Sequence, residues 1–399
     1  MDSFLELAGI VDLGEFLEGW FMDTTAVDEI KHDNMIEFIA YGFYSKRVDA
    51  LTEEERKEIE VFMKRVYKAF GQKPFKPGYN AEAKFMGHTL EPLRSFHKPL
   101  IIYAFMELIG VINMGILWWF GFKRLSSRRN GRSSRGTMSM FIRDYRPTKR
   151  IGETNGSHAS KKEPLVFIHG VGLGILPYVH FLGQVLANIS RPCIVVEMRH
   201  VSMRFSINHR SISLPTLAND IVDQMHSIGF QKGFFLSHSY GTFIVAKILQ
   251  LRPEAVDRVC LIDPVCCMTC YPKLTRNFVY RSYQGWPMAS KKRFMDFVQL
   301  LFSRDLTIAD TFCRHLNGMD VNVFANDFPV NEGNKKHLLV LSGQDPLVPS
   351  HLVLKQFKGA SHVDTLYNEA HGHGDFLFDS KYLAYLVVDL CARIEDESL

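Results

Sequence analysis

The sequence has few cysteines, 7 among 399 residues, and their spacing is irregular. An odd number without a regular pattern excludes a disulfide framework and favours free thiols in a reducing compartment. Cys266, Cys267 and Cys270 contain one CxxC pair, but no second pair follows at a matching spacing, so no metal site is predicted. No basic residue precedes Lys31, and we therefore expect no cleavable secretory signal.

An excess of one charge is also absent. Lys and Arg number 47 against 43 Asp and Glu, which leaves a net charge of +4. So small and so clustered an excess argues against a nucleic-acid surface that covers a whole domain, and we predict no nucleic-acid partner. The length allows one α/β domain of roughly 200 to 250 residues and one smaller unit.

Residues 1–98 are predicted to form an N-terminal helical region. Thr52 and Glu55 form a capping box before a run with apolar residues on one helical face, and Gly71 ends that run. Residues 4–21, acidic and aromatic, are predicted to form a second amphipathic helix.

Residues 99–122 form an apolar segment long enough to cross a bilayer. Trp118 and Trp119 stand near one end, where aromatic residues meet the membrane surface. Glu107 and Asn113 interrupt the segment, and a carboxylate near the middle of a span costs about 2.5–3.5 kcal/mol. We expect membrane association, as a span or at the surface; the alternative is a helix that packs against the following domain.

Residues 123–163 are predicted to form a basic, Ser/Gly-rich linker without an acidic residue until Asp144. A basic cluster beside an apolar segment favours anionic lipid headgroups and places the chain after it in the cytosol. The predicted membrane contact therefore covers residues 99–135. The basic residues that support it are Lys123, Arg124, Arg128, Arg129, Arg132 and Arg135.

From residue 164 to residue 399 the sequence predicts an α/β domain with a doubly wound, mostly parallel sheet. Short apolar runs alternate there with helical stretches. The strands are expected at residues 165–168, 193–196, 233–236, 259–262 and 338–341. The alternation stops at about residues 266–336, which are rich in aromatic and basic residues, and we predict an inserted helical cap there.

A serine turn follows the strand at residues 233–236. Ser239 has small residues two positions before and after it, Ser237 and Gly241, and an apolar helix follows. Such a strand–turn–helix lifts a serine hydroxyl above the sheet, and the small neighbours let two backbones approach closely. The motif predicts that Ser239 is a nucleophile, although Ser237 stands where glycine is usual.

A serine nucleophile needs a general base and a group that orients this base. Asp345 follows the strand at residues 338–341, and Asp263, the rival acid, follows the strand at residues 259–262. Two histidines lie further on, His371 and His373, each beside glycine. We prefer His373, because an apolar helix follows it, and we prefer Asp345 as the orienting carboxylate.

Two backbone N–H groups are predicted to form the oxyanion hole: that of Tyr240, after the nucleophile, and that of Val171, in the glycine-rich turn after the first strand. Glycines in that turn also resemble a dinucleotide-binding pattern. Ile175 stands where that pattern needs glycine or alanine, which argues against a bound nucleotide.

Residues 164–399 resemble the α/β-hydrolase superfamily. The resemblance rests on four features in that family's order: the turn at His169 and Gly170, the elbow at Ser239, Asp345, and His373. It implies the α/β-hydrolase fold, a cap inserted after the sixth strand, and hydrolysis through an acyl-enzyme. The N-terminal apolar segment joined to this domain resembles uncharacterised membrane-associated members from fungi and algae.

The sequence therefore predicts a membrane-associated serine hydrolase, an esterase or lipase acting on a small lipophilic carboxylic ester, with its hydrolase domain facing the cytosol. Ser239, His373 and Asp345 form the expected triad, and no cofactor or metal is expected. The alternative, suggested by Ser237 in the elbow, is a catalytically silent hydrolase fold that serves as a binding or signalling module.

Overall fold

A computed structural model describes residues 1–23, 25–125, 138–144, 162–205, 211–282, 290–330 and 335–395. These residues divide into two compact units. Unit 1 comprises Met1–His97, Val265–Ala325 and Asp345–Gly359, and unit 2 comprises Lys98–Pro264, Asn326–Gln344 and Ala360–Leu399. The N-terminal helical region thus shares a unit with most of the predicted cap.

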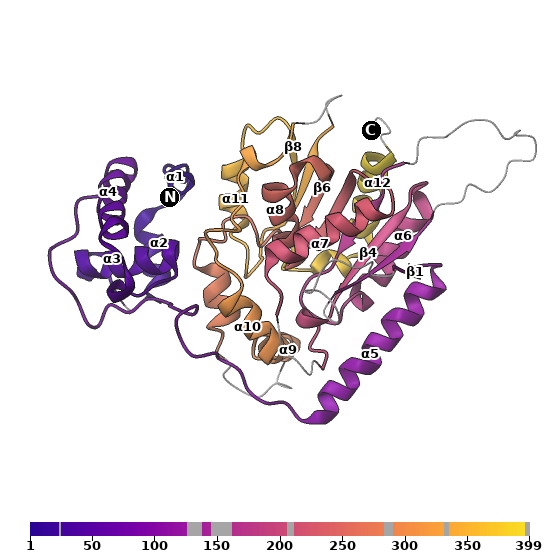
Figure 1. Ribbon diagram of the computed structural model, residues 1–399, viewed down its shortest axis with the longest axis horizontal. Helices are drawn as coiled ribbons and strands as arrows, with labels where there is room; N and C mark the ends of the chain where they lie inside the picture. The colour runs from indigo at the N-terminus through magenta and orange to yellow at the C-terminus, as the bar shows by residue number, and fades with distance from the viewer. Residues whose placement is uncertain are drawn as a thin grey trace, which may run out of the picture. The chain divides into compact units, whose positions relative to one another are not determined.

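Unit 2 is built on one sheet with the strand order β1-β2-β4-β3-β5-β6-β7-β8 (Figure 1). Strands β3 to β8 run parallel, and β1 and β2 form an antiparallel edge beside β4. The strands are β1 Lys123–Arg124, β2 Met138–Arg143, β3 Leu165–Ile168, β4 Cys193–Met198, β5 Gly233–His238, β6 Val256–Ile262, β7 His337–Ser342 and β8 Val363–Asn368.

Helices cover both faces of this sheet. On one face, α6 (Val179–Asn188) and α12 (Ser380–Glu395) bury Phe181 and Leu386 against Phe167, Val195 and Leu236 of the strands. On the other face, α7 (Leu214–Ser227) packs beside α8 (Gly241–Leu251). Central strands covered on both faces are apolar along their whole length, which is why their runs were visible in the sequence.

The five predicted strands are confirmed, and three further strands were not predicted. Strand β2 lies within the segment predicted to be a linker, and it buries Met138, Met140 and Phe141. Strand β8 forms the opposite edge and is mostly partly buried or exposed. Edge strands carry polar residues on their outer side, so they lack the continuous apolar run of a central strand.

Unit 1 is helical. The capping box at Thr52 is confirmed, because it begins α4, and Gly71 ends that helix in the left-handed conformation. The predicted helix over residues 4–21 is wrong: a turn at Gly9, with φ +83°, separates two helices, and Asp12 caps the second. The helices are α1 Asp2–Leu5, α2 Leu13–Trp20, α3 His32–Ile39, α4 Glu53–Phe70, α9 Lys291–Ser303, α10 Leu306–Arg314 and α11 Ser350–Phe357.

The N-terminal helices pack against residues 265–325 within unit 1. The Trp20 indole donates a hydrogen bond of 2.9 Å to the Cys270 carbonyl oxygen. Arg314 donates to the carbonyl oxygens of His88, Thr89 and Glu91. Aromatic rings fill the space between the helices in mostly edge-to-face contacts, including Phe4 with Phe16 and Phe62.

Helix α5, Leu100–Trp119, belongs to unit 2 and has two different faces. One face is buried and contains Met106, Ile109, Gly110, Asn113 and Leu117. The other face exposes Leu100, Ile101, Phe105, Leu108, Val111, Ile112, Met114, Trp118 and Trp119. Among the described residues, α5 is the one helix long and apolar enough to cross a membrane, with a mean hydropathy of 2.1.

Candidate active site

The serine predicted as nucleophile lies on a strained turn between β5 and α8. Ser239 has φ +52°, a left-handed conformation that residues with a Cβ rarely adopt. Two backbone hydrogen bonds hold it: the Ser239 N–H donates to Ile262 O at 3.0 Å, and Thr242 N–H donates to Ser239 O at 2.9 Å. Strain at a residue held this firmly is typical of functional sites.

The two small neighbours of Ser239 have different importance. A Cβ on Gly241 would lie 2.4 Å from the Ile168 carbonyl oxygen, so only glycine lets α8 approach β3. Ser237 lies inside β5, fully buried, and pairs in register with Ile168 and Leu261. The extra Cβ and hydroxyl at position 237 are therefore accommodated without disturbing the turn.

A parallel sheet in this strand order, with a serine turn between β5 and α8 at its carboxyl edge, decides the fold. The chain has the α/β-hydrolase fold. In this hydrolase fold, catalytic side chains gather where the parallel strands end. The segments after β3, β5, β6, β7 and β8 carry all the site residues that the sequence predicted.

The structure brings His373 to the serine. Its Nε2 atom lies 2.8 Å from the Ser239 hydroxyl oxygen. Gly374 follows with φ +81°, and its N–H donates to Asp263 Oδ2 at 2.7 Å, which fixes the loop behind the imidazole. His371 points elsewhere, because its Nε2 contacts Asp379 Oδ2 at 3.1 Å and its ring packs on Tyr382.

Asp263 is buried at the end of β6 and accepts hydrogen bonds from several segments of unit 2. Its Oδ1 accepts from the Ser342 hydroxyl at 2.6 Å, and its Oδ2 accepts from Gly374 N–H and contacts His238 Nε2 at 3.3 Å. Burial alone would raise the pKa of Asp263, but these donors and the nearby His373 lower it below its usual value. Asp263 therefore carries its negative charge and organises the loops around it.

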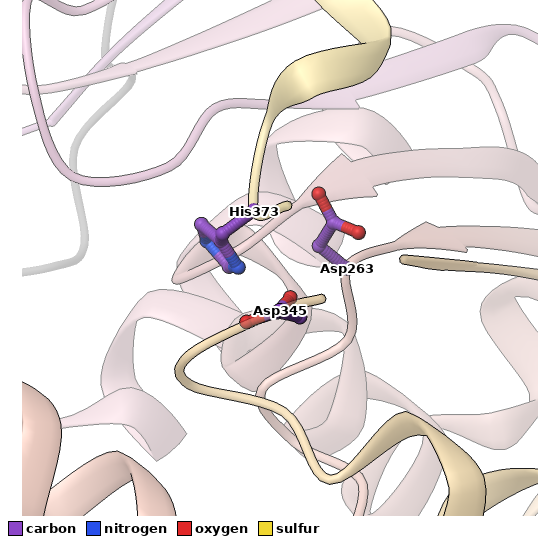
Figure 2. A group of neighbouring side chains, drawn as sticks. All are labelled: Asp263, Asp345 and His373. Atoms are coloured by element: carbon purple, nitrogen blue, oxygen red, sulfur yellow. The ribbon is translucent and has the colours of Figure 1, made fainter. Parts of the chain in front are cut away.

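Asp345 lies in the loop after β7, three residues beyond the end of that strand. Its Oδ1 accepts hydrogen bonds from Leu347 N–H at 2.7 Å and Val348 N–H at 3.0 Å, so the carboxylate is held by its own loop. Figure 2 shows Asp263, Asp345 and His373 together, and one polar atom from each lies within 4.8 Å of the others. Both candidate acids thus stand close to the candidate base.

A second histidine, His238, belongs to this site, and no signal in the sequence indicated a role for it there. His238 precedes the serine, its Nδ1 lies 2.6 Å from the Tyr178 hydroxyl, and its ring lies 5.2 Å from that of His373. The Tyr178 hydroxyl also accepts from Gly170 N–H at 3.2 Å. Hydrogen bonds therefore connect the turn after β3 to Asp263 through Tyr178 and His238. Neither residue stands out in the sequence, because Tyr178, just before α6, and His238, at the end of β5, meet only in the folded chain.

The predicted oxyanion donors lie on the segments that flank the serine. Tyr240 follows Ser239 and caps the start of α8. Gly170 comes so close that a Cβ on it would lie 2.9 Å from the Ser239 Cβ, and Val171 is the next residue. The turn after β3 therefore runs beside Ser239, where the predicted oxyanion donors would be needed.

Two carboxylates and an imidazole are also suitable ligands for a divalent metal. Here the Asp263 oxygens already accept N–H and O–H groups, and His373 Nε2 faces the serine hydroxyl. These donors would compete with a cation for the same oxygens and nitrogen. The arrangement fits hydrogen-bonded acid–base chemistry better than metal coordination.

No protein-family model and no curated protein sequence matches the chain. Solved α/β structures do match it. A carboxylesterase of the thaumarchaeon Nitrososphaera gargenis is 15% identical, with a TM-score of 0.45, over 69% of this chain and 99% of its own. A bacterial membrane phospholipase A is 15% identical, with a TM-score of 0.45, over 73% and 94%. The carboxylesterase CesB of Bacillus subtilis is 13% identical, with a TM-score of 0.41, over 72% and 98%.

Proposed function

We propose that this α/β hydrolase is a serine hydrolase that cleaves carboxylic esters. The observation that carries the proposal is the 2.8 Å contact between Ser239 Oγ and His373 Nε2 at the strained turn. A serine hydroxyl is a weak nucleophile until a base within hydrogen-bond reach can take its proton. The distance between His373 Nε2 and Ser239 Oγ, and the left-handed conformation of Ser239, support these roles.

The first step forms an acyl-enzyme. Ser239 Oγ attacks the ester carbonyl carbon while His373 Nε2 takes the hydroxyl proton, and the C=O electron pair moves onto the oxygen. The N–H groups of Val171 and Tyr240 are the proposed donors to that oxyanion. When the C–O bond breaks, His373 returns the proton to the departing alcohol. Water then attacks the acyl-enzyme with the same proton transfers and releases the acid.

The orienting carboxylate is assigned to Asp345. Both oxygens of Asp263 accept hydrogen bonds, from Ser342 and Gly374, whereas Asp345 is held by its own loop through Oδ1 and has a carboxylate oxygen within 4.8 Å of a ring nitrogen of His373. We assign Asp345 Oδ2 to the Nδ1–H of His373, which would hold the imidazole in the tautomer that leaves Nε2 ready to accept. Asp263 then supports the site by fixing Gly374 and His238.

Labelling with a fluorophosphonate, which reacts with activated serines, tests the proposal. Wild-type protein should be labelled, and Ser239→Ala should not. Ser237→Ala is the matched control, because it removes a serine hydroxyl two residues away that has no hydrogen-bond partner among the described residues. Unlabelled but folded wild-type protein would contradict the proposal and favour the silent binding module.

The proposed substrate is lipophilic because we propose that the enzyme works at a membrane. Helix α5 exposes nine large apolar side chains, with Trp118 and Trp119 at one end and Lys123 and Arg124 just beyond it. Apolar faces this large are uncommon on monomeric soluble proteins. The other basic residues of the predicted cluster, Arg128 to Arg135, lie outside the described residues.

Activity should rise with acyl chain length in a series of nitrophenyl esters. Preference for the shortest ester would contradict a lipophilic substrate.

Polar contacts along α5 favour a position in the plane of the membrane surface. Glu107 pairs with Arg199 and Arg204, each at 2.9 Å, and Arg204 also pairs with Glu197. Asn113 donates to the Leu173 carbonyl oxygen at 2.9 Å. Because these contacts join the side of α5 to loops of the sheet domain, α5 could enter the bilayer core only if those polar loops entered it too. We therefore propose that the exposed apolar face of α5 lies among lipid headgroups and upper acyl chains.

Depth measurements separate this arrangement from a membrane span. Single cysteines at Ile101, Leu108 and Ile112 carrying a fluorophore should report similar shallow depths in vesicles that contain brominated lipids. A span would instead place Leu108 and Ile112 much deeper than Ile101.

Leu108→Asp should weaken vesicle binding by about tenfold, because a charge enters the lipid-facing side. Val388→Asp, at an exposed apolar site on α12, should leave vesicle binding unchanged. Protease protection in sealed microsomes tests the proposed cytosolic side.

A further inference from the structure

Unit 1 contains a cavity whose lining includes neither Ser239 nor His373. Helices α2, α3 and α4 form one wall of it, and residues 269–279 and 312–319 form another. The volume that the centre of a water molecule could occupy inside it is about 80 Å³. A cavity that holds a single water needs only ~10–15 Å³ of such volume. A packed protein core rarely contains a void of this size.

The lining is apolar and uncharged. It contains aromatic and aliphatic side chains such as Phe16, Trp20 and Val66, and among the described lining residues there is no Asp, Glu, Lys or Arg. Burial lowers the pKa of His88 to about 4, so this lining residue is neutral, and its Nδ1 lies 2.8 Å from the Tyr41 hydroxyl. Apolar cavities stay dry and bind apolar molecules.

A second hollow, of about 330 Å³ on the same measure, adjoins this cavity. The two share Phe4, Phe43, Cys270 and Met319 in their walls. Two acidic side chains, Glu58 and Asp320, line the second hollow, and Met1, whose α-amino group is positively charged, also lines it, so its charged groups are acidic on balance. The Tyr44 hydroxyl donates to Glu58 Oε2 at 2.6 Å.

We propose that unit 1 binds a single-chain lipid with an uncharged polar head. The alkyl chain fits the inner cavity, since chain methylenes gain about 0.8 kcal/mol each on leaving water. The head fits the outer hollow, where hydroxyl groups can donate hydrogen bonds to Glu58 and Asp320 and where a carboxylate or phosphate would be repelled. A monoalkylglycerol has this chemistry. The site stands on the cavity alone and does not require that Ser239 be reactive.

Equilibrium dialysis with radiolabelled 1-O-dodecylglycerol tests the site. The ether bond resists ester hydrolysis, and full-length Ser239→Ala protein removes turnover in any case. The ligand is kept below its micelle-forming concentration, and laurate serves as the anionic ligand of equal chain length. We expect saturable binding of the glycerol ether and weaker binding of laurate.

Substitutions then place the ligand. Val66→Phe fills the cavity and should weaken binding about tenfold, the effect of excluding roughly two methylene groups. Val61→Phe is the matched control, because Val61 is 57% exposed on the same helix. Thr275→Leu, on the opposite wall, replaces Val66→Phe if that variant does not fold. The double variant Glu58→Gln, Asp320→Asn should bring laurate affinity up toward that of the ether.

Three outcomes would overturn the proposal. Folded protein without saturable binding would show that the cavity takes no such lipid. Equal losses in Val66→Phe and Val61→Phe would place the ligand elsewhere, for example on α5. Tighter binding of laurate than of the ether would reject the uncharged head. Fluorophosphonate labelling of wild-type protein is measured separately, so failure of this site and failure of the serine hydrolase proposal are distinguishable.

Discussion

The carboxyl edge of the sheet in unit 2 and the cavity in unit 1 are built in opposite ways. At the sheet edge, Asp263 contacts three residues, Ser342, His238 and Gly374, and Ser239 lies on a strained turn fixed by backbone hydrogen bonds. Around the cavity, aromatic rings and methionines meet without charge. Polar networks fix geometry to within tenths of an ångström, whereas apolar walls adapt to what they hold.

The contrast shows that proton transfer and the binding of an alkyl chain need different kinds of surroundings. Proton transfer needs short, directed contacts, and these come from rigid strand ends that converge at one edge of a sheet. Chain binding needs volume and apolar area, which helices with adjustable side chains supply. Substitutions at the sheet edge should therefore act mainly on rate, and those around the cavity mainly on affinity.

The largest effect is expected from the nucleophile and its base. Ser239→Ala or His373→Ala should lower kcat for a soluble nitrophenyl ester by about 10³- to 10⁶-fold with unfolding unchanged. His371→Gln, whose side chain contacts Asp379, should retain wild-type activity within about threefold. Equal losses from His371 and His373 variants would break the assignment of the base.

The next largest effects should distinguish the two acids, Asp345 and Asp263, by whether a substitution lowers kcat or stability. Asp345→Asn should lower kcat by about 10³- to 10⁴-fold while the fold stays intact, because the imidazole loses its orienting partner. Asp263→Asn should lower the free energy of unfolding by about 2–4 kcal/mol, because a buried anion with several donors becomes an amide. If Asp263→Asn loses activity at full stability and Asp345→Asn stays active, Asp263 is the orienting acid.

Acid should weaken unit 2 more than unit 1. Burial lowers the pKa of His169 and His337 in unit 2, and of His88 in unit 1, to about 4. Unfolded histidines titrate near 6.5, so this stability is present above about pH 6.5 and is lost as the pH falls toward 4. By pH 5 each histidine should cost about 2 kcal/mol. Hydrogen exchange at pH 7 and pH 5 should show a larger loss of protection in β3 and β7 than in α2 and α4.

The smallest effect concerns the residue that departs from the usual elbow. The Ser237 hydroxyl is buried in β5 and has no hydrogen-bond partner among the described residues. Ser237→Ala should raise the free energy of unfolding by about 1 kcal/mol and leave kcat near wild type. Urea denaturation measures the first quantity. A destabilised variant would show that the hydroxyl has a partner after all.

Much of the fold could be predicted, because the central strands of a sheet covered on both faces are continuously apolar. Strands β3 to β7 matched their predicted positions within a few residues. The edge strand β8 and strand β2, next to the short edge strand β1, escaped prediction, since neither is buried along its whole length. The helix expected over residues 4–21 failed because Gly9 and the Asp12 cap break an otherwise amphipathic pattern.

The sequence by itself predicted Ser239 as the nucleophile and located its turn, because strand, turn and helix follow one another directly in the chain and their sterics are local. Only the tertiary structure decided which of His371 and His373 faces Ser239. Both histidines precede the same helix, and the conformation of the loop turns His373 toward Ser239 and His371 toward Asp379. Only it revealed Tyr178 and His238 as partners, the inward face of α5, and the cavity of unit 1. Each of these depends on segments distant in the chain, and the energy of their contacts arises only when the chain packs.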